Sequence, residues 1–273
     1  MVSAVQTLPL RSGGAIPQLG LGVWQAPRGE CREAVLAALR LGYRHIDTAR
    51  IYGNEADVGD AIRDSGIPRD QIFVTTKLWN DDQGYDSALR AFDASAKRLG
   101  LDYIDLYLIH WPVPGTRLDS WRALEKLHAD KRARAIGVSN FLVGHLEQLF
   151  TKANEKPAVN QIELTPFLQR RDTVALCHKE KIVVEAYSPL TRGKRLNDPT
   201  ITSIAKELGK SPAQVLLRWG VEKGVVVLPK SVHEARIAEN GAIFDFALTP
   251  AQLARLDALE ENLATGWDPA TMA

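Results

Sequence analysis

Four side chains that can hold charge or move a proton stand close to the ends of strand-like segments. They are a carboxylate, a phenol, an amine and an imidazole, at Asp47, Tyr52, Lys77 and His110. A phenol has a pKa of about 10 and is a poor acid at neutral pH unless a nearby charge stabilises its anion. Lys77 could supply that charge while Asp47 holds the lysine, and His110 could bind a substrate oxygen. The set predicts a general acid that protonates a developing alkoxide.

Short β-branched segments alternate with amphipathic helical segments along the whole chain. We expect an N-terminal hairpin over residues 5–18, followed by about eight strands and ten helices. The strands are expected at 19–22, 44–47, 72–77, 103–110, 135–139, 158–162, 182–188 and 225–228. The helices are expected at 30–41, 55–65, 85–99, 120–130, 143–152, 171–180, 199–208, 212–222, 234–241 and 250–259.

This alternation predicts the α/β fold class, as a (β/α)8 TIM barrel with the hairpin closing its bottom. The chain has 273 residues, and no linker rich in proline, glycine or serine divides it. We therefore expect a single domain over residues 1–273. An open doubly wound sheet is the alternative, but the strand count and the length favour the barrel. In a barrel the active site lies at the carboxyl ends of the strands, where the four residues would meet.

Composition narrows the classes of function. A formal net charge of +1 argues against a nucleic-acid binder. No apolar run is long enough to span a membrane, and the N-terminus lacks the pattern of a signal peptide. Cys31 and Cys177 have no ligand-spaced neighbours, so we expect reduced thiols and no metal site. These features predict a cytoplasmic protein that acts on a small molecule, and the lack of a long apolar stripe predicts a monomer.

The four residues include no hydride donor, so a carbonyl reduction would need a cofactor. Gly20 and Gly22 begin a G-x-G-x-x-G pattern that fails at its third glycine, and a Rossmann site is not expected. A barrel can instead hold a phosphate near the loops after its last strands. In Lys230–Arg236, a lysine and a serine precede an expected helix whose first turns contain Arg236. An arginine near the ribose suits a 2′-phosphate, which predicts NADP(H) rather than NAD.

The chain resembles the aldo-keto reductase family over nearly its whole length. The matching stretches are Gly42–Ala49 with Tyr52–Glu55, Leu101–Pro112, Ile136–Phe141 and Pro229–Val232. Its short chain and compact loops resemble the bacterial 2,5-diketo-D-gluconate reductases. The resemblance implies an NADP-dependent oxidoreductase in which Tyr52 is the proton donor.

The resemblance also implies cofactor contacts. Ser139, Asn140 and Gln161 match residues that bind the nicotinamide carboxamide, and Tyr187 matches the residue on which the nicotinamide stacks. Residues matching the loop over the pyrophosphate are Ser188 and Leu190. Residues matching the 2′-phosphate pocket and the adenine contacts are Lys230, Ser231, Val232, Arg236, Glu239 and Asn240.

Two positions depart from the commonest pattern of the family. Thr165 stands where many members have histidine, which we expect to alter local packing. His233 stands where threonine is common, beside the expected 2′-phosphate pocket. A histidine there could change the preference for NADP over NAD or make it depend on pH.

Three tryptophans follow strands and would ring the mouth of a barrel together with His110. They are Trp24, Trp79 and Trp111, and they could line a substrate pocket or simply cap the core. Aromatic walls suit a carbonyl compound with an apolar body. The loop after Trp111 and the segment after Leu259 are short, which predicts an open pocket for small aldehydes, α-dicarbonyls and keto sugar acids.

Two other functions remain open on the sequence alone. Lys77 could form a Schiff base with a carbonyl substrate, as in barrel lyases. Alternatively, the protein could be an NADPH-binding regulatory subunit with little turnover, as some relatives are.

Overall fold

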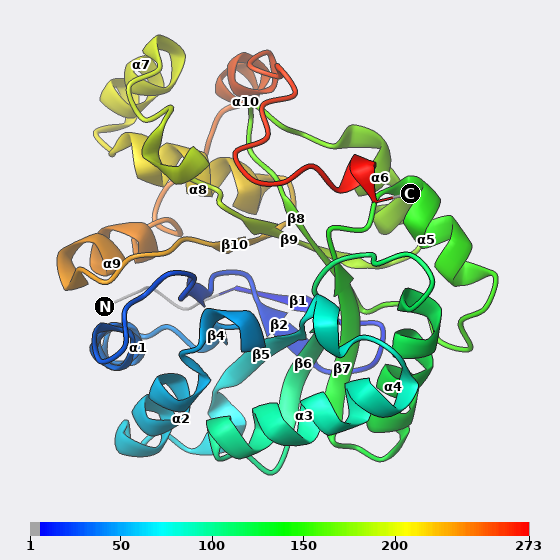
Figure 1. The fold of residues 1–273 in the computed structure, drawn as a ribbon. Coiled ribbons are helices and arrows are strands. Elements are labelled where there is room, and N and C mark those ends of the chain that lie inside the picture. Colours follow the sequence, from blue (N-terminus) through cyan, green and yellow to red (C-terminus); the bar gives the residue numbers. More distant parts are fainter. Residues whose placement is uncertain (1–5, 273) are drawn as a thin grey trace.

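The computed structural model describes residues 6–272, and parallel strands form its centre (Figure 1). Its eight-stranded sheet consists of β3 (Leu21–Gly22), β4 (His45–Asp47), β5 (Phe73–Leu78), β6 (Ile104–Ile109), β7 (Ala133–Ser139), β8 (Val159–Glu163), β9 (Val183–Tyr187) and β10 (Val226–Leu228). Each strand pairs with the next one along the chain. Parallel bridges from Leu19 to Val227 and from Gly22 to Lys230 join the two ends of the sheet. The predicted barrel is thereby confirmed.

Helices cover the outside of this barrel (Figure 1). They are α1 (Glu30–Arg40), α2 (Glu55–Asp64), α3 (Tyr85–Leu99), α4 (Arg117–Ala129), α5 (Val143–Phe150), α6 (Arg171–Lys179), α7 (Pro199–Leu208), α8 (Pro212–Glu222), α9 (Glu234–Gly241) and α10 (Pro250–Asp257). Each predicted helix is present, although α4 begins at Arg117 and not at Ser120. The Arg117 guanidinium donates to the carbonyl of Pro112 and to Gln148, which draws this residue into the helix start. None of the helices within residues 6–272 is long and apolar enough to cross a membrane.

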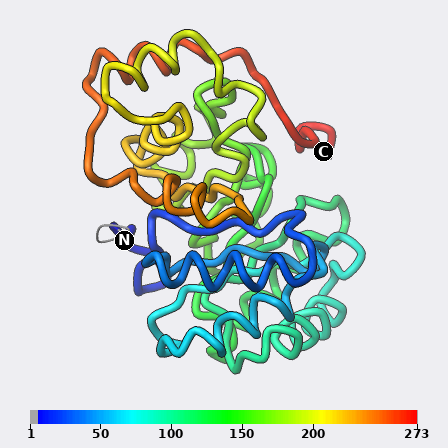
Figure 2. Tube along the Cα trace, turned by 90° about the vertical axis from the view of Figure 1, so that its left-hand side faces the viewer, coloured from blue at the N-terminus to red at the C-terminus, as the bar shows by residue number. Residues whose placement is uncertain are grey.

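The N-terminal hairpin closes one end of the barrel, as predicted. Its strands β1 (Thr7–Pro9) and β2 (Ala15–Pro17) pair antiparallel, while Val5 of the expected hairpin lies outside the described residues. Leu10 and Ile16 are buried in one cluster with barrel residues such as Leu106. Figure 2 shows the C-terminal segment, in red, on the side of the barrel away from this dark-blue hairpin. The opposite mouth is therefore the open one.

The barrel interior is apolar next to the hairpin and polar farther along the barrel axis. The cluster next to the hairpin is apolar and includes Leu106, Leu108, Ala135, Val159, Val226 and Leu228. Buried polar side chains from strands β4, β5, β8 and β9 include His45, Asp47, Thr75, Lys77, Gln161 and Glu185. Buried charges are costly unless they are paired and hydrogen-bonded. The interior polar groups must therefore satisfy one another, and their pairing determines the geometry at the mouth.

Close helix packing beside the first strands depends on one glycine. A Cβ added to Gly59 of α2 would collide with the backbone carbonyl of Leu99 at the end of α3. We expect Gly59→Ala to lower the free energy of unfolding by about 1–3 kcal/mol, because backbone must move to accept the methyl group. Urea unfolding followed by circular dichroism measures the change.

The matched control is Gly144→Ala in α5, where an added Cβ meets nothing within 4 Å. Alanine suits a helix better than glycine, so this variant should unfold at the same or a slightly higher urea concentration. Equal unfolding midpoints for the two variants would contradict the packing argument.

Candidate active site

An ion pair between Lys77 and Asp47 lies at the base of the barrel mouth. Neighbouring strands β5 and β4 carry the two residues, and Lys77 is fully buried. Its Nζ donates to Asp47 Oδ1 at 2.7 Å, to Asp47 Oδ2 at 2.8 Å and to the carbonyl of Thr48 at 2.9 Å. An ammonium has three N–H donors, and these contacts occupy all of them. The pair thus fixes the position of one positive charge.

Lys77 stays protonated in this setting. Burial is the largest single influence and lowers the pKa of Lys77, but the hydrogen bond to Asp47 and the charges of Asp47, Tyr52 and Glu185 together outweigh it, so the pKa lies above its ordinary value. The amine therefore has no free lone pair at neutral pH. It can act as a fixed positive charge, and it is a poor nucleophile.

Tyr52 places a phenol above this charge. It ends a short 3-10 helix, Arg50–Tyr52, that follows β4, and its ring centroid lies 5.2 Å from Lys77 Nζ. Burial raises the pKa of Tyr52; Lys77 opposes that rise and Asp47 adds to it. As predicted, Lys77 lowers the pKa of Tyr52. Burial outweighs Lys77, so the pKa of Tyr52 stays above its ordinary value. The phenol thus keeps its proton until a strongly basic oxygen, such as a developing alkoxide, takes it.

His110 lies beside the phenol as a neutral imidazole. It follows β6, and its ring makes edge contacts with Tyr52 at 5.9 Å and with Trp79 at 5.2 Å between centroids. Burial, together with the charge of Lys77, holds the pKa of His110 well below its usual range. A neutral imidazole can donate one hydrogen bond to a substrate oxygen. Since it carries no extra proton, Tyr52 is the better proton source of the two.

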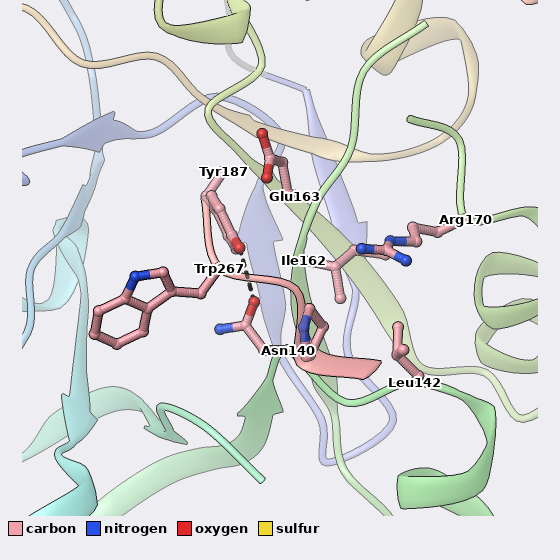
Figure 3. A pocket seen from close by; sticks show the side chains of 8 residues that line it. Asn140, Leu142, Ile162, Glu163, Arg170, Tyr187 and Trp267 are labelled. Carbon is pink, nitrogen blue, oxygen red and sulfur yellow. Dashed lines mark hydrogen bonds between the residues drawn. The ribbon is translucent and has the colours of Figure 1, made fainter. Parts of the chain in front are cut away.

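A hydrogen-bond network joins the ends of β7, β8 and β9. Tyr187 Oη donates to Asn140 Oδ1 at 2.8 Å, and the two side chains point toward each other in Figure 3. Asn140 Nδ2 donates to the His110 carbonyl at 3.0 Å and to Ser139 Oγ at 3.1 Å. Ser139 Oγ in turn donates to the carbonyl of Gln161 at 2.9 Å. The four residues predicted to hold a nicotinamide therefore lie together beside His110.

The residues predicted to hold a nucleotide phosphate lie around the start of α9. Lys230, Ser231 and Val232 connect β10 to this helix, and Arg236 is in its first turns. Lys230 and Arg236 are exposed, and neither forms an ion pair with another residue of 6–272. Two cations without a carboxylate partner beside a helix N-terminus fit a phosphate group.

The remaining predicted cofactor residues lie at two places. Ser188 and Leu190 belong to the loop after β9, and both are partly buried. On α9, Glu239 is exposed whereas Asn240 is buried.

The structure also shows the contacts of Thr165 and His233, the two residues that depart from the family pattern. Thr165 Oγ1 accepts from the backbone N–H groups of Phe167 and Leu168 and so shapes the turn after β8, while the backbone N–H of His233 donates to Ser231 Oγ.

Each predicted tryptophan has a distinct neighbour at the mouth. Trp79 contacts His110, Trp111 lies 5.8 Å from Trp267 between ring centroids, and the Arg192 guanidinium carbon is 4.5 Å from the Trp24 ring centroid. Sequence reasoning did not identify Trp267 as part of this wall. It lies in an irregular segment without the periodicity that predicts position.

Glu163 holds the segment that carries Trp267. Its carboxylate accepts from the backbone N–H groups of Thr265 at 2.9 Å and Gly266 at 3.2 Å. Trp267 is 69% exposed, the most of any large hydrophobic residue among those described. In Figure 3 its side chain extends away from Arg170. The C-terminal segment therefore adds an aromatic wall to the open end of the barrel.

Comparisons with known proteins show the family to which this chain belongs. The model of the Aldo/keto reductase family matches residues 18–261. A glyoxal reductase from Bacillus subtilis is 48% identical over 268 residues, covering 98% of this chain and 97% of that protein. A morphine 6-dehydrogenase from Pseudomonas putida is 49% identical, covering 95% and 93%. A structure of a Gox0644 variant in complex with NADPH superposes with a TM-score of 0.94 at 42% identity, covering 98% of this chain and 99% of that one.

Tyr52 should lose its proton at a higher pH than an ordinary tyrosine in the cofactor-free protein, because burial raises its pKa. The near-ultraviolet absorbance of tyrosinate measures this when wild type is compared with Tyr52→Phe. We expect the tyrosinate signal that is lost in Tyr52→Phe to have its midpoint above the ordinary tyrosine value. A tyrosinate signal lost in Tyr52→Phe, with a midpoint clearly below 10, would mean that Lys77 outweighs burial.

Proposed function

As a member of the aldo/keto reductase family this chain is an NADP(H)-dependent oxidoreductase, and we propose that it reduces small aldehydes, α-dicarbonyls and keto sugar acids with Tyr52 as the proton donor. One observation carries the proposal. A protonated phenol lies over a fixed ammonium, next to a neutral imidazole, at the mouth of the barrel. This arrangement suits a reaction in which negative charge develops on one oxygen.

Asp47, Tyr52, Lys77 and His110, here called the tetrad, divide the tasks of this reaction, in which Asp47 holds Lys77 in place. NADPH, when bound, supplies the hydride that is added to the carbonyl carbon. As charge develops on the carbonyl oxygen, Tyr52 transfers its proton to that oxygen, and Lys77 stabilises the phenolate that remains. His110 donates a hydrogen bond to the same oxygen and orients it. General acid assistance of this kind typically contributes about 10²–10⁴-fold to the rate.

The residues around the tetrad would hold the cofactor. Ser139, Asn140 and Gln161 would bind the carboxamide, and Tyr187 would stack on the nicotinamide. Ser188 and Leu190 would lie over the pyrophosphate. The adenosine 2′-phosphate and the adenine would be held by Lys230, Ser231, Val232, Arg236, Glu239 and Asn240.

The aromatic mouth supports the proposed range of substrates. Trp24, Trp79, Trp111 and Trp267 offer apolar walls around His110, and the short loops leave the mouth open. A small carbonyl compound would reach Tyr52 without displacing a lid. Glyoxal is the substrate named for one relative, and this α-dicarbonyl falls within the proposed range. The 2,5-diketo-D-gluconate type of keto sugar acid belongs to the same proposal.

A substrate panel tests the proposal. Glyoxal, methylglyoxal, 2,5-diketo-D-gluconate and an aromatic aldehyde are each mixed with NADPH or NADH, and loss of reduced-nicotinamide absorbance gives kcat and KM. We expect turnover with NADPH, and a fall of at least about 10²-fold in kcat for Tyr52→Phe with NADPH binding retained. Near-normal kcat in that variant would exclude Tyr52 as the donor. NADPH binding without oxidation of any substrate would favour a role as a binding subunit.

A Schiff-base lyase is disfavoured by the state of Lys77. All three of its N–H donors are engaged by Asp47 and Thr48, and its pKa is raised. Imine formation requires a neutral amine, which this pairing suppresses.

Arg236 should set the preference for NADPH over NADH. In Arg236→Ala we expect the Kd for NADPH to rise about 10- to 100-fold, because a charge-assisted contact to the 2′-phosphate is lost, while the Kd for NADH stays unchanged. Nucleotide titration followed by tryptophan fluorescence gives both constants. The control is Lys206→Ala, an exposed cation on α7. An equal loss for NADPH and NADH in Arg236→Ala would argue against a 2′-phosphate contact.

We further propose that the protein is a monomer. The exposed large hydrophobic residues among those described are Trp24, Ile51 and Trp267. Trp24 and Trp267 belong to the proposed substrate walls, and Ile51 precedes Tyr52 in the same 3-10 helix. Within residues 6–272 they leave no separate apolar face for a second copy.

A further inference from the structure

Glu185 is a buried acid directly beneath the proposed nicotinamide site. It lies on β9 two residues before Tyr187, and its register partner on β8 is Gln161. Its side chain is fully buried in the barrel interior. Oε2 accepts a hydrogen bond from Gln161 Nε2 at 3.0 Å, whereas Oε1 has no hydrogen-bond partner among residues 6–272. The sequence did not mark this residue, and the tetrad does not use it.

Two acids, Glu185 on the adjacent strand β9 and Asp47 on the more distant strand β4, hold the side-chain amide of Gln161. Gln161 Nε2 donates to Glu185 Oε2 and, at 2.8 Å, to Asp47 Oδ2. An NH2 group has two donors, and both are therefore used. The reverse orientation of the amide would place its oxygen against the ionised Asp47 carboxylate. The Asp47 carboxylate thus selects one orientation of the amide, and Glu185 accepts from its second N–H.

The opposite end of the amide remains available. Gln161 Oε1 accepts no hydrogen bond within the described part of the chain, residues 6–272. The backbone of Gln161 is also fixed, because its carbonyl accepts from Ser139 Oγ and from the backbone N–H of Asn140, each at 2.9 Å. Gln161 therefore presents one oriented acceptor beside Ser139 and Asn140.

We propose that Glu185 is a positioning residue for the cofactor: with Asp47 it fixes the Gln161 amide so that Oε1 can accept from the nicotinamide carboxamide. This inference rests on the proposed role of Gln161 in holding that carboxamide. Orienting a polar group before binding lowers the free-energy cost of ordering it when the ligand arrives. Glu185 acts only through Gln161 and touches no reacting atom.

The charge state of Glu185 agrees with this role. Burial raises the pKa of Glu185 to about 8, and the negative charge of Asp47 adds to the rise. His45 Nε2 is 3.7 Å from Glu185 Oε1, but burial lowers the pKa of His45 to about 4, so the contact is not an ion pair at neutral pH. A neutral acid still accepts from Gln161 and adds no second negative charge beside Asp47.

Binding measurements at pH 7 test the inference without relying on turnover. Glu185→Leu removes the acceptor at similar volume, and Glu185→Gln retains an acceptor oxygen. NADPH and adenosine 2′,5′-bisphosphate, which lacks the nicotinamide, are titrated against each variant. We expect Glu185→Leu to raise the Kd for NADPH roughly tenfold, as for the loss of one oriented hydrogen bond, and to leave the Kd for the bisphosphate unchanged. Glu185→Gln should bind NADPH within about twofold of wild type.

A double-mutant cycle with Gln161→Leu shows whether Glu185 acts through Gln161. In the Gln161→Leu background, Glu185→Leu should cause no further loss of NADPH affinity. The inference is overturned if Glu185→Leu binds NADPH as wild type does, if it weakens both ligands equally, or if the two losses multiply. Should Glu185→Leu fail to fold, a tenfold loss of NADPH affinity in Glu185→Gln would overturn it as well. Wild-type turnover with NADPH is measured separately, so a failure of the proposed reductase activity is distinguishable.

Discussion

The buried ion pair of Lys77 and Asp47 is the constraint on which the rest of the site depends. A charge inside a barrel is tolerated only when it is paired and hydrogen-bonded, and this pair meets that condition with three donor contacts from one ammonium. Because these contacts fix the Lys77 ammonium, its electric field acts on the same neighbouring side chains at all times. That field opposes the effect of burial on Tyr52 and contributes to keeping His110 neutral. The same carboxylate also holds Gln161, so the proposed proton transfer and the proposed cofactor contact would share one anchor.

The division of the barrel interior explains how such a pair is accommodated. An apolar plug, closed by Leu10 and Ile16 of the hairpin, supplies burial at one end. The polar groups are confined to the other end, where His45 meets Thr75 and Gln161 bridges Asp47 and Glu185. Loops at that end carry the tryptophans and the C-terminal segment held by Glu163. The apolar cluster that stabilises the fold and the polar groups of the proposed active site thus lie at opposite ends of one barrel.

Much of this could be predicted from the sequence, for identifiable physical reasons. The periodicity of apolar residues predicts the strands and helices. Asp47, Lys77 and His110 lie at the carboxyl ends of strands, and a barrel places these ends at the same mouth. Glu185 could not be recognised, because a glutamate within a strand reads as a solvated charge until its neighbours across the barrel are known. Trp267 lies in an irregular segment whose path depends on Glu163. The net pKa of Tyr52 depends on desolvation, and a sequence does not give its extent.

The central claim is that Asp47 and Lys77 act as one unit in preparing Tyr52, and a double-mutant cycle on kcat tests it most directly. Asp47→Asn, Lys77→Met and the double variant are compared with wild type at pH 7, with folding checked by circular dichroism. Residues that act as a unit give non-additive losses. We expect each single variant to lose at least about 10²-fold in kcat and the double variant to lose no more than the worse single one. A double variant whose loss equals the product of the two single losses would contradict the account.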